Sequence, residues 1–206
     1  MNTKTMQRAA LWVLSAVVLA GCAVIGVERF DISSYAKASF AEKGPARLDR
    51  LDQSDLQRTC SEYALKPLPD AVRARLEKQE LARIKYPSDG RFLGDWKQGE
   101  AIAQSGRGLQ FSDAANTVAG GNCYACHQLT KEEVSYGTIG PSLHHYGKLR
   151  GNSEPILKYT WGKIWNAHAF NACTNMPRFG DAGILNEAQL RHVMALLLDP
   201  ASPVNR

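Results

Sequence analysis

Five consecutive residues, Cys123-Tyr124-Ala125-Cys126-His127, carry the clearest chemical signal of the chain. Two thiols three positions apart can form thioether bonds with the two vinyl groups of haem, and the adjacent histidine can then bind the iron. A zinc site would need a second ligand pair at short spacing, and the sequence offers none. A thioredoxin-type dithiol would need flanking strands, and no strand pattern surrounds the motif. The motif therefore predicts one covalently bound haem c.

Met176 is the predicted second iron ligand, opposite His127. It opens the stretch Met176-Pro177-Arg178-Phe179-Gly180, which lies in a segment without helical periodicity. Met194, in contrast, falls on the apolar face of a predicted helix and fits the core. A thioether ligand favours ferrous iron relative to a second imidazole and so raises the reduction potential. Four histidines remain as competing ligands: His144, His145, His168 and His192.

Cys60 and Cys173 lie outside the haem motif. In an oxidising compartment such a pair tends to close as a disulfide, which here would tie the N-terminal part to the segment before Met176. Two alternatives stay open at this stage. Cys173 could itself be a ligand or a reactive thiol, or the two cysteines could remain free or pair with other chains.

The N-terminus has the pattern of a bacterial export signal. Residues 1–8 hold two basic residues and no acidic one, and residues 9–27 form an apolar run. This pattern predicts that the rest of the chain lies in the periplasm. Three endings of the signal stay open: lipidation of Cys22 in the lipobox-like Leu19-Ala20-Gly21-Cys22, cleavage after residues 21–23, or retention as a membrane anchor.

Length and composition indicate a globular chain. With 206 residues, 44% hydrophobic and 22% charged, the chain is neither disordered nor a multi-span membrane protein. The net charge of +5 is not gathered in a block of one sign, so no nucleic-acid surface is expected. The predicted division is an export signal over 1–21, a helical N-terminal extension over 22–94 and a haem domain over 95–206.

The predicted fold is all-α, a cytochrome c-type domain of short helices wrapped around the haem. Apolar periodicity and capping residues predict five helices: 54–65, 70–85, 96–104, 154–167 and 186–199. Ser54 and Ser153 are candidate N-caps, and Asn186 with Gln189 resembles a capping box. Gly99 is costly inside a helix unless another segment approaches it closely. Long loops are predicted over 106–121, 137–151 and 171–183.

Taken together, these stretches resemble the SoxX family, the mono-haem cytochrome subunits of SoxAX complexes in sulfur-oxidising bacteria. The resemblance covers residues 95–206. It rests on four stretches in order: Gly121-Asn122-Cys123-Tyr124-Ala125-Cys126-His127-Gln128, Gly137-Thr138-Ile139-Gly140-Pro141-Ser142-Leu143, Met176-Pro177-Arg178-Phe179-Gly180 and Leu198-Asp199-Pro200-Ala201-Ser202-Pro203-Val204-Asn205. Family members usually read Asn-Pro before the methionine, whereas this chain has Asn171-Ala172-Cys173, which leaves the path of that loop open. The extension resembles one that some members carry.

The resemblance implies roles for residues and for the whole chain. The carbonyl of Pro141 would accept the Nδ1 proton of His127, and Leu143 would pack on the haem face. The chain would be the electron-transfer subunit of an L-cysteine S-thiosulfotransferase, in a heterodimer with a SoxA-type cytochrome. That partner couples thiosulfate to a cysteine of the SoxY–SoxZ carrier, and the electrons pass on to a small soluble cytochrome c.

No catalytic residue is expected in this chain, because His127 and Met176 would fill both axial positions of the iron. An alternative function is an independent, membrane-anchored c-type cytochrome. Such a protein would shuttle electrons between another dehydrogenase and an oxidase.

Overall fold

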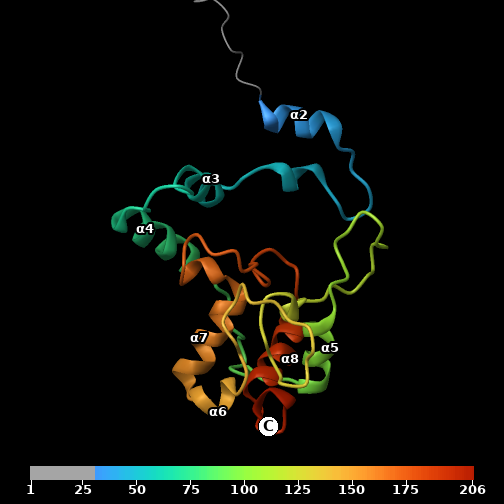
Figure 1. Ribbon diagram of the computed structural model, residues 1–206, viewed down its shortest axis with the longest axis vertical. Helices are drawn as coiled ribbons and strands as arrows, with labels where there is room; N and C mark the ends of the chain where they lie inside the picture. Colours follow the sequence, from blue (N-terminus) through green and yellow to red (C-terminus); the bar gives the residue numbers. More distant parts are fainter. Residues whose placement is uncertain (1–30) are drawn as a thin grey trace, which may run out of the picture. The chain divides into compact units, whose positions relative to one another are not determined.

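The computed structural model describes residues 31–206, which form helices joined by long irregular segments (Figure 1). No strand occurs over this range, so the predicted all-α class is confirmed. The predicted export signal over 1–21 and the candidate lipidation site Cys22 lie outside the described residues. Among the helices of residues 31–206, none has both the length and the apolar character needed to cross a bilayer.

The chain divides into two compact units, Met1–Ser39 and Phe40–Arg206. In the first unit, the structure describes helix α2 (Ile32–Ser39). The α-helices of the second unit are α3 (Asp55–Glu62), α4 (Asp70–Leu81), α5 (Trp96–Gln104), α6 (Tyr146–Arg150), α7 (Glu154–Trp165) and α8 (Glu187–Leu198). Its 3₁₀ helices are η1 (Leu48–Leu51), η2 (Cys123–Ala125), η3 (Ala167–Ala169) and η4 (Pro203–Asn205). Much of the predicted extension thus belongs to the same unit as the predicted haem domain.

Two helices begin at complete capping boxes. The Ser54 hydroxyl accepts from the backbone N–H of Gln57, whose side chain accepts in return from the N–H of Ser54. Asn186 and Gln189 exchange the same pair of bonds at the start of α8. Ser153 is the N-cap residue of α7, as predicted, but its side chain makes no capping hydrogen bond.

Helix α6 lies inside the range predicted as a loop, 137–151. Its five residues are too few to give a recognisable period in the sequence. Long-range contacts stabilise it instead: the Tyr146 hydroxyl lies 2.8 Å from the Thr160 hydroxyl, and the N–H of His145 donates to the carbonyl of Val204 at 2.7 Å. Tertiary packing therefore outweighs the loop-like composition of this segment.

Helices α5 and α8 lie side by side and meet at Gly99 (Figure 1). A Cβ atom at position 99 would lie 2.1 Å from the carbonyl oxygen of His192. Beside this crossing, the N–H of Gly94 donates to the carbonyl of Arg191, and the N–H of Asp95 donates to Nδ1 of His192, both at 2.9 Å. The close approach of the two backbones explains the glycine inside α5.

The second unit has two hydrophobic clusters. The larger is centred on α7 and α8, and it contains Trp161, Leu190, Met194 and Val204, each at most 1% exposed. The smaller joins Leu56 of α3 and Leu76 of α4 to Ala172, which precedes the predicted ligand Met176. The first cluster supports the predicted haem domain, and the second attaches the extension to it.

Candidate haem site

The Cys-x-x-Cys-His motif forms a tight turn at the C-terminal end of α5. The N–H of Gly121 donates to the carbonyl of Ile102 at 2.8 Å, and the N–H of Asn122 donates to that of Ser105 at 2.9 Å. Asn122 has a φ of 46°, a left-handed conformation that asparagine tolerates better than most residues. It leads directly into η2, which contains Cys123. Helix α5 therefore fixes where the turn begins.

The segment after Gly137 runs along this turn and is bonded to it by its backbone. Three N–H groups donate to carbonyls of the turn at 2.8 Å each: Gly137 to Tyr124, Gly140 to Cys126 and Leu143 to Gln128. The side-chain hydroxyl of Ser142 also lies 3.0 Å from the Gln128 side chain. These bonds bring the Gly-Pro-x-Leu stretch and the haem motif together.

The imidazole of His127 is held by backbone atoms of this segment. Its Nδ1 atom lies 2.7 Å from the carbonyl oxygen of Pro141. Because a carbonyl oxygen accepts and cannot donate, Nδ1 carries the proton and the lone pair lies on Nε2. A Cβ atom at Gly140 would lie 2.2 Å from Cε1 of the ring, so the ring packs directly on the backbone there. The site thus holds an oriented imidazole whose Nε2 is left free to bind a metal.

The two thiols of the motif are free cysteines. Burial raises the pKa of Cys123 to about 12, so this thiol is protonated at neutral pH. A reactive dithiol or a zinc ligand needs a stabilised thiolate, which usually has a cation or a helix N-terminus beside it. The environment of Cys123 therefore does not favour either of those rival uses.

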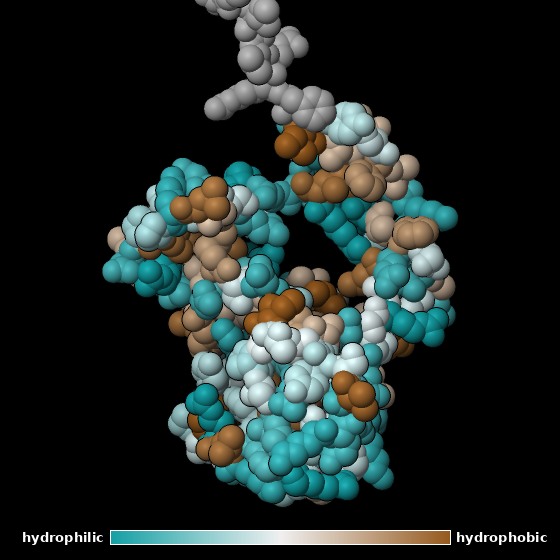
Figure 2. All heavy atoms as spheres, viewed as in Figure 1, coloured by the Kyte–Doolittle hydropathy of each residue, from teal (hydrophilic) through white to brown (hydrophobic). Residues whose placement is uncertain are grey.

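Several half-buried apolar side chains come from segments far apart in the sequence. They pack against the larger core cluster: Ile102, Cys123, Leu143, Trp165, Met176 and Ile184. Figure 2 shows a group of hydrophobic side chains near the middle of the second unit, above a mostly hydrophilic surface in the lower part of the view. Cys123, Leu143 and Met176 thus each pack against the same hydrophobic core.

Trp165 places a buried hydrogen-bond donor, its indole N–H, among these apolar side chains. Its ring packs on the segment after Met176, since a Cβ atom at Gly180 would lie 2.4 Å from it. Its indole N–H is buried and has no hydrogen-bond partner among the described residues. A buried donor without an acceptor is unfavourable, and a propionate carboxylate of haem would supply one. Two thiols, an oriented imidazole, a thioether and this donor together fit haem c.

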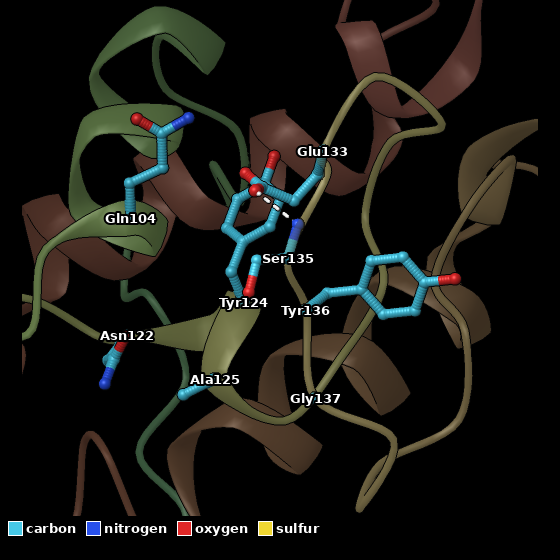
Figure 3. Close-up of a pocket in the computed structure, with 8 residues that line it drawn as sticks. All are labelled: Gln104, Asn122, Tyr124, Ala125, Glu133, Ser135, Tyr136 and Gly137. Atoms are coloured by element: carbon cyan, nitrogen blue, oxygen red, sulfur yellow. Dashed lines mark hydrogen bonds between the residues drawn. The ribbon is translucent and has the colours of Figure 1, made fainter.

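A polar pocket of about 640 Å³ lies beside the turn. Figure 3 shows that its walls come from the end of α5, the turn and the segment over 133–137, with the Glu133 carboxylate accepting from the N–H of Ser135. Its lining includes Tyr124 and Ala125 but neither thiol of the motif, nor His127, nor Met176. We therefore do not assign the haem to this pocket.

Three of the four competing histidines are engaged with the backbone. A ring nitrogen of each lies within hydrogen-bond distance of a backbone atom: His145 with the Arg206 carbonyl at 2.5 Å, His168 with the Ala172 carbonyl at 2.6 Å, and His192 with the Asp95 N–H at 2.9 Å. The ring of His144 stacks on His145 at 3.7 Å, and its two nitrogens are buried without a partner among the described residues.

Cys60 and Cys173 are joined by a disulfide. The bond links α3 to the segment that carries Met176, three residues further along the chain. Cys173 is therefore not available as an iron ligand or a reactive thiol in this structure.

An ion-pair network beside Met176 was missed by the sequence analysis. It joins α4 and Arg83, two residues beyond the end of that helix, to the segment after the methionine. Its members are Glu80, Arg83, Arg178 and Asp181. Arg178 was visible as part of the methionine motif. Its partners on α4 were not, because no pattern in a single sequence relates residues that lie about a hundred positions apart.

No protein-family model matches the chain. It is 34% identical over 186 residues to a protein of Aquifex aeolicus (strain VF5) described as "Uncharacterized lipoprotein". The match covers 88% of this chain and 86% of the relative, so it extends beyond the predicted haem domain into the extension. At this identity over nearly the whole of both chains, the protein belongs to the same family as this Aquifex lipoprotein.

Proposed function

We propose that the chain is a periplasmic, lipid-anchored, mono-haem c-type cytochrome that serves as the electron-transfer subunit of a SoxAX-type complex. The observation that carries this proposal is the bond of His127 Nδ1 to the Pro141 carbonyl at 2.7 Å, in a turn whose Cys123 packs on the same core as Met176. Cys123 and Cys126 would hold the haem covalently, and His127 and Met176 would be its axial ligands. When bound, the haem takes up and releases one electron at a time.

The protein's own residues set the conditions for that transfer. The Pro141 carbonyl holds the His127 proton on Nδ1, which orients the ring and raises its basicity as a ligand. Met176 contributes a neutral sulfur, which favours the reduced state. Half-buried apolar side chains on the same core, Leu143 and Ile102 among them, would limit the access of water to the haem. None of these residues transforms a substrate.

The SoxAX assignment rests on the four stretches in order that resemble SoxX. In this proposal a SoxA-type cytochrome forms a heterodimer with the chain and joins thiosulfate to a cysteine of the SoxY–SoxZ carrier. That oxidation releases two electrons, which this chain receives singly and passes to a small soluble cytochrome c. The chain is thus the electron-transfer subunit of an L-cysteine S-thiosulfotransferase and is not catalytic alone.

The lipid anchor is proposed at Cys22. Its support is the lipobox-like sequence that ends there, together with the description of the Aquifex relative as a lipoprotein. An intact mass of the mature chain tests it. Acylation with Cys22 as the new N-terminus supports the anchor, and a mature chain that begins elsewhere contradicts it.

The decisive experiment uses the purified holo-chain with a SoxA-type partner, the SoxY–SoxZ carrier and thiosulfate. The expected result is a stable one-to-one complex in which the haem of this chain is reduced, and omission of the carrier should prevent the reduction. If the haem is not reduced under these conditions, the SoxAX assignment is wrong. Reduction by several unrelated dehydrogenases without a stable complex would instead indicate the independent shuttle.

A further inference from the structure

We propose that α3, α4 and Arg83 form a clamp that holds Met176 in place as an iron ligand. The clamp is attached to the chain on both sides of the methionine, by the Cys60–Cys173 disulfide before it and by ion pairs to Arg178 and Asp181 after it. The inference rests on the proposed function, since it takes Met176 as the ligand. It gives the extension a part inside the haem site, beyond any docking role.

The attachment before Met176 is covalent and also hydrophobic. Besides the disulfide to Cys60, Ala172 is 1% exposed and packs between Leu56 of α3 and Leu76 of α4. Its N–H also donates to the Glu77 carboxylate of α4 at 3.3 Å. Both helices therefore contact the chain within four residues of the methionine.

The attachment after Met176 is ionic. Arg83, just beyond α4, makes two bonds to the Asp181 carboxylate, at 3.0 and 2.9 Å. Arg178, two residues after the methionine, lies 3.8 Å from Glu80 and 3.7 Å from Asp181. Each side thus contributes one carboxylate and one guanidinium group: Glu80 and Arg83 on one side, and Asp181 and Arg178 on the other.

Glu80 is the buried centre of this network, at 7% exposure. Its carboxylate accepts from the Asn166 side-chain amide at 2.7 Å, and that asparagine is fully buried. A buried carboxylate is stable only when hydrogen bonds and cations compensate it, so Arg83 and Arg178 are held near Glu80. The network therefore has a buried centre and fixes the position of the segment that follows Met176.

The segment between the two attachments has little structure of its own. Residues 171–183 contain no helix, and the N–H of Met176 donates to the Thr174 hydroxyl at 3.2 Å. Holding a side chain in one geometry on such a segment costs conformational entropy. Fixing both ends of the segment reduces the number of positions that the methionine sulfur can take, so the sulfur stays where the iron ligand must be.

The test uses the full-length, ferric holo-chain and two variants that loosen the clamp on opposite sides: the double variant Cys60→Ser/Cys173→Ser, and Arg83→Gln. The Arg83 side chain is 53% exposed, so its replacement leaves the core packing intact. The matched control is Arg191→Gln, which breaks another two-bond arginine–aspartate pair, with Asp89 on a different part of the unit.

The main readout is the apparent affinity of added imidazole for the ferric haem, because imidazole must displace Met176. Both clamp variants should bind imidazole about tenfold more tightly than the parent, as a loosened ligand competes less well. Their methionine-to-iron charge-transfer band in the near infrared should weaken, and backbone amides over 174–180 should exchange hydrogen faster. Arg191→Gln should match the parent in all three measurements.

Two outcomes would overturn the clamp, and they are distinguishable. If the parent shows the methionine band and both clamp variants bind imidazole within about twofold of the parent, the clamp is wrong while the haem assignment stands. If the parent lacks the methionine band, Met176 is not the ligand, and this part of the proposed function fails together with the clamp.

Discussion

Nδ1 of His127 and the carbonyl oxygen of Pro141 lie 2.7 Å apart, and this bond sets the orientation of the imidazole from the backbone. The neighbouring Gly140 lets the ring pack directly on that backbone. Since the acceptor is a main-chain atom, its position depends on the path of the segment that follows Gly137. Substitutions that displace this segment should therefore act on the ring, even though they change no polar side chain.

Gly140→Ala is expected to disturb the site. The added Cβ would lie 2.2 Å from Cε1 of His127, so the ring or the backbone must move. Over-packing of this kind costs about 1–3 kcal/mol. We expect a lower free energy of unfolding in urea and less covalent haem per chain, measured by absorbance and intact mass.

Gly106→Ala is the matched control for that substitution. Its Cβ would lie 3.2 Å from the end of the Asn122 side chain, which can rotate away. We expect a change of less than about 0.5 kcal/mol in unfolding free energy, with normal haem content. Equal effects of the two substitutions would show that close packing on His127 is not the cause.

Gly99→Ala tests the crossing of α5 and α8. Alanine has the higher helix propensity, by about 1 kcal/mol, so an isolated helix would gain stability. Here the Cβ would lie 2.1 Å from the carbonyl of His192, and the two helices must separate. We expect the clash to outweigh the propensity, with a net loss of about 2 kcal/mol in urea unfolding. A stabilised variant would contradict this packing.

Much of the fold is predictable because its signals are local. The capping boxes at Ser54 and Asn186 mark the first residues of α3 and α8, since the cap and its partner lie three residues apart. The cost of Gly99 inside a helix indicated that something approaches it closely, and the structure shows that this is the backbone of α8 at His192. Ser153 occupies the predicted N-cap position without a capping hydrogen bond, because residue type alone does not fix the side-chain rotamer.

The remaining features depend on long-range contacts. Helix α6 is too short for a periodic pattern, and its bonds to Thr160 and Val204 come from distant segments. The Glu80 and Arg83 contacts behind Met176 have the same origin: charged residues on an exposed-looking helix resemble any solvated face in the sequence. The sequence could nominate the candidate ligands and, through the family resemblance, the Pro141 carbonyl behind His127, but not the charged residues behind Met176.

Met176→Leu tests the second ligand directly. Leucine keeps a similar volume, so the half-buried site should stay packed, with a cost below about 1.5 kcal/mol. The methionine-to-iron charge-transfer band should disappear, and the reduction potential should change, because leucine cannot coordinate. His144→Gln serves as the control on the competing ligand. If the visible and near-infrared spectrum is unchanged in Met176→Leu and altered in His144→Gln, His144 and not Met176 is the second iron ligand.

His144 should make stability depend on pH in a mildly acidic range. Its ring nitrogens are buried, and burial, followed by the charge of His145, lowers its pKa. The unfolded chain therefore takes up this proton at a higher pH than the folded chain does. As the pH falls through about 6.5, the ordinary histidine value, the free energy of unfolding should decrease.

The measurement that checks this is urea unfolding of the holo-chain and of His144→Gln at about pH 7 and about pH 5. The difference between the two pH values should be smaller in the variant, because glutamine does not titrate. The titration of Asp89 does not contribute to the difference in unfolding free energy between these two pH values. Its pKa is lowered, chiefly by the N–H of Arg91 and then by the Arg191 side chain, so its stabilising charge begins to be lost near the ordinary aspartate value of about 4, below this window. An unchanged pH dependence in the variant would mean that the folded protein accommodates the charged His144 ring as well as water does.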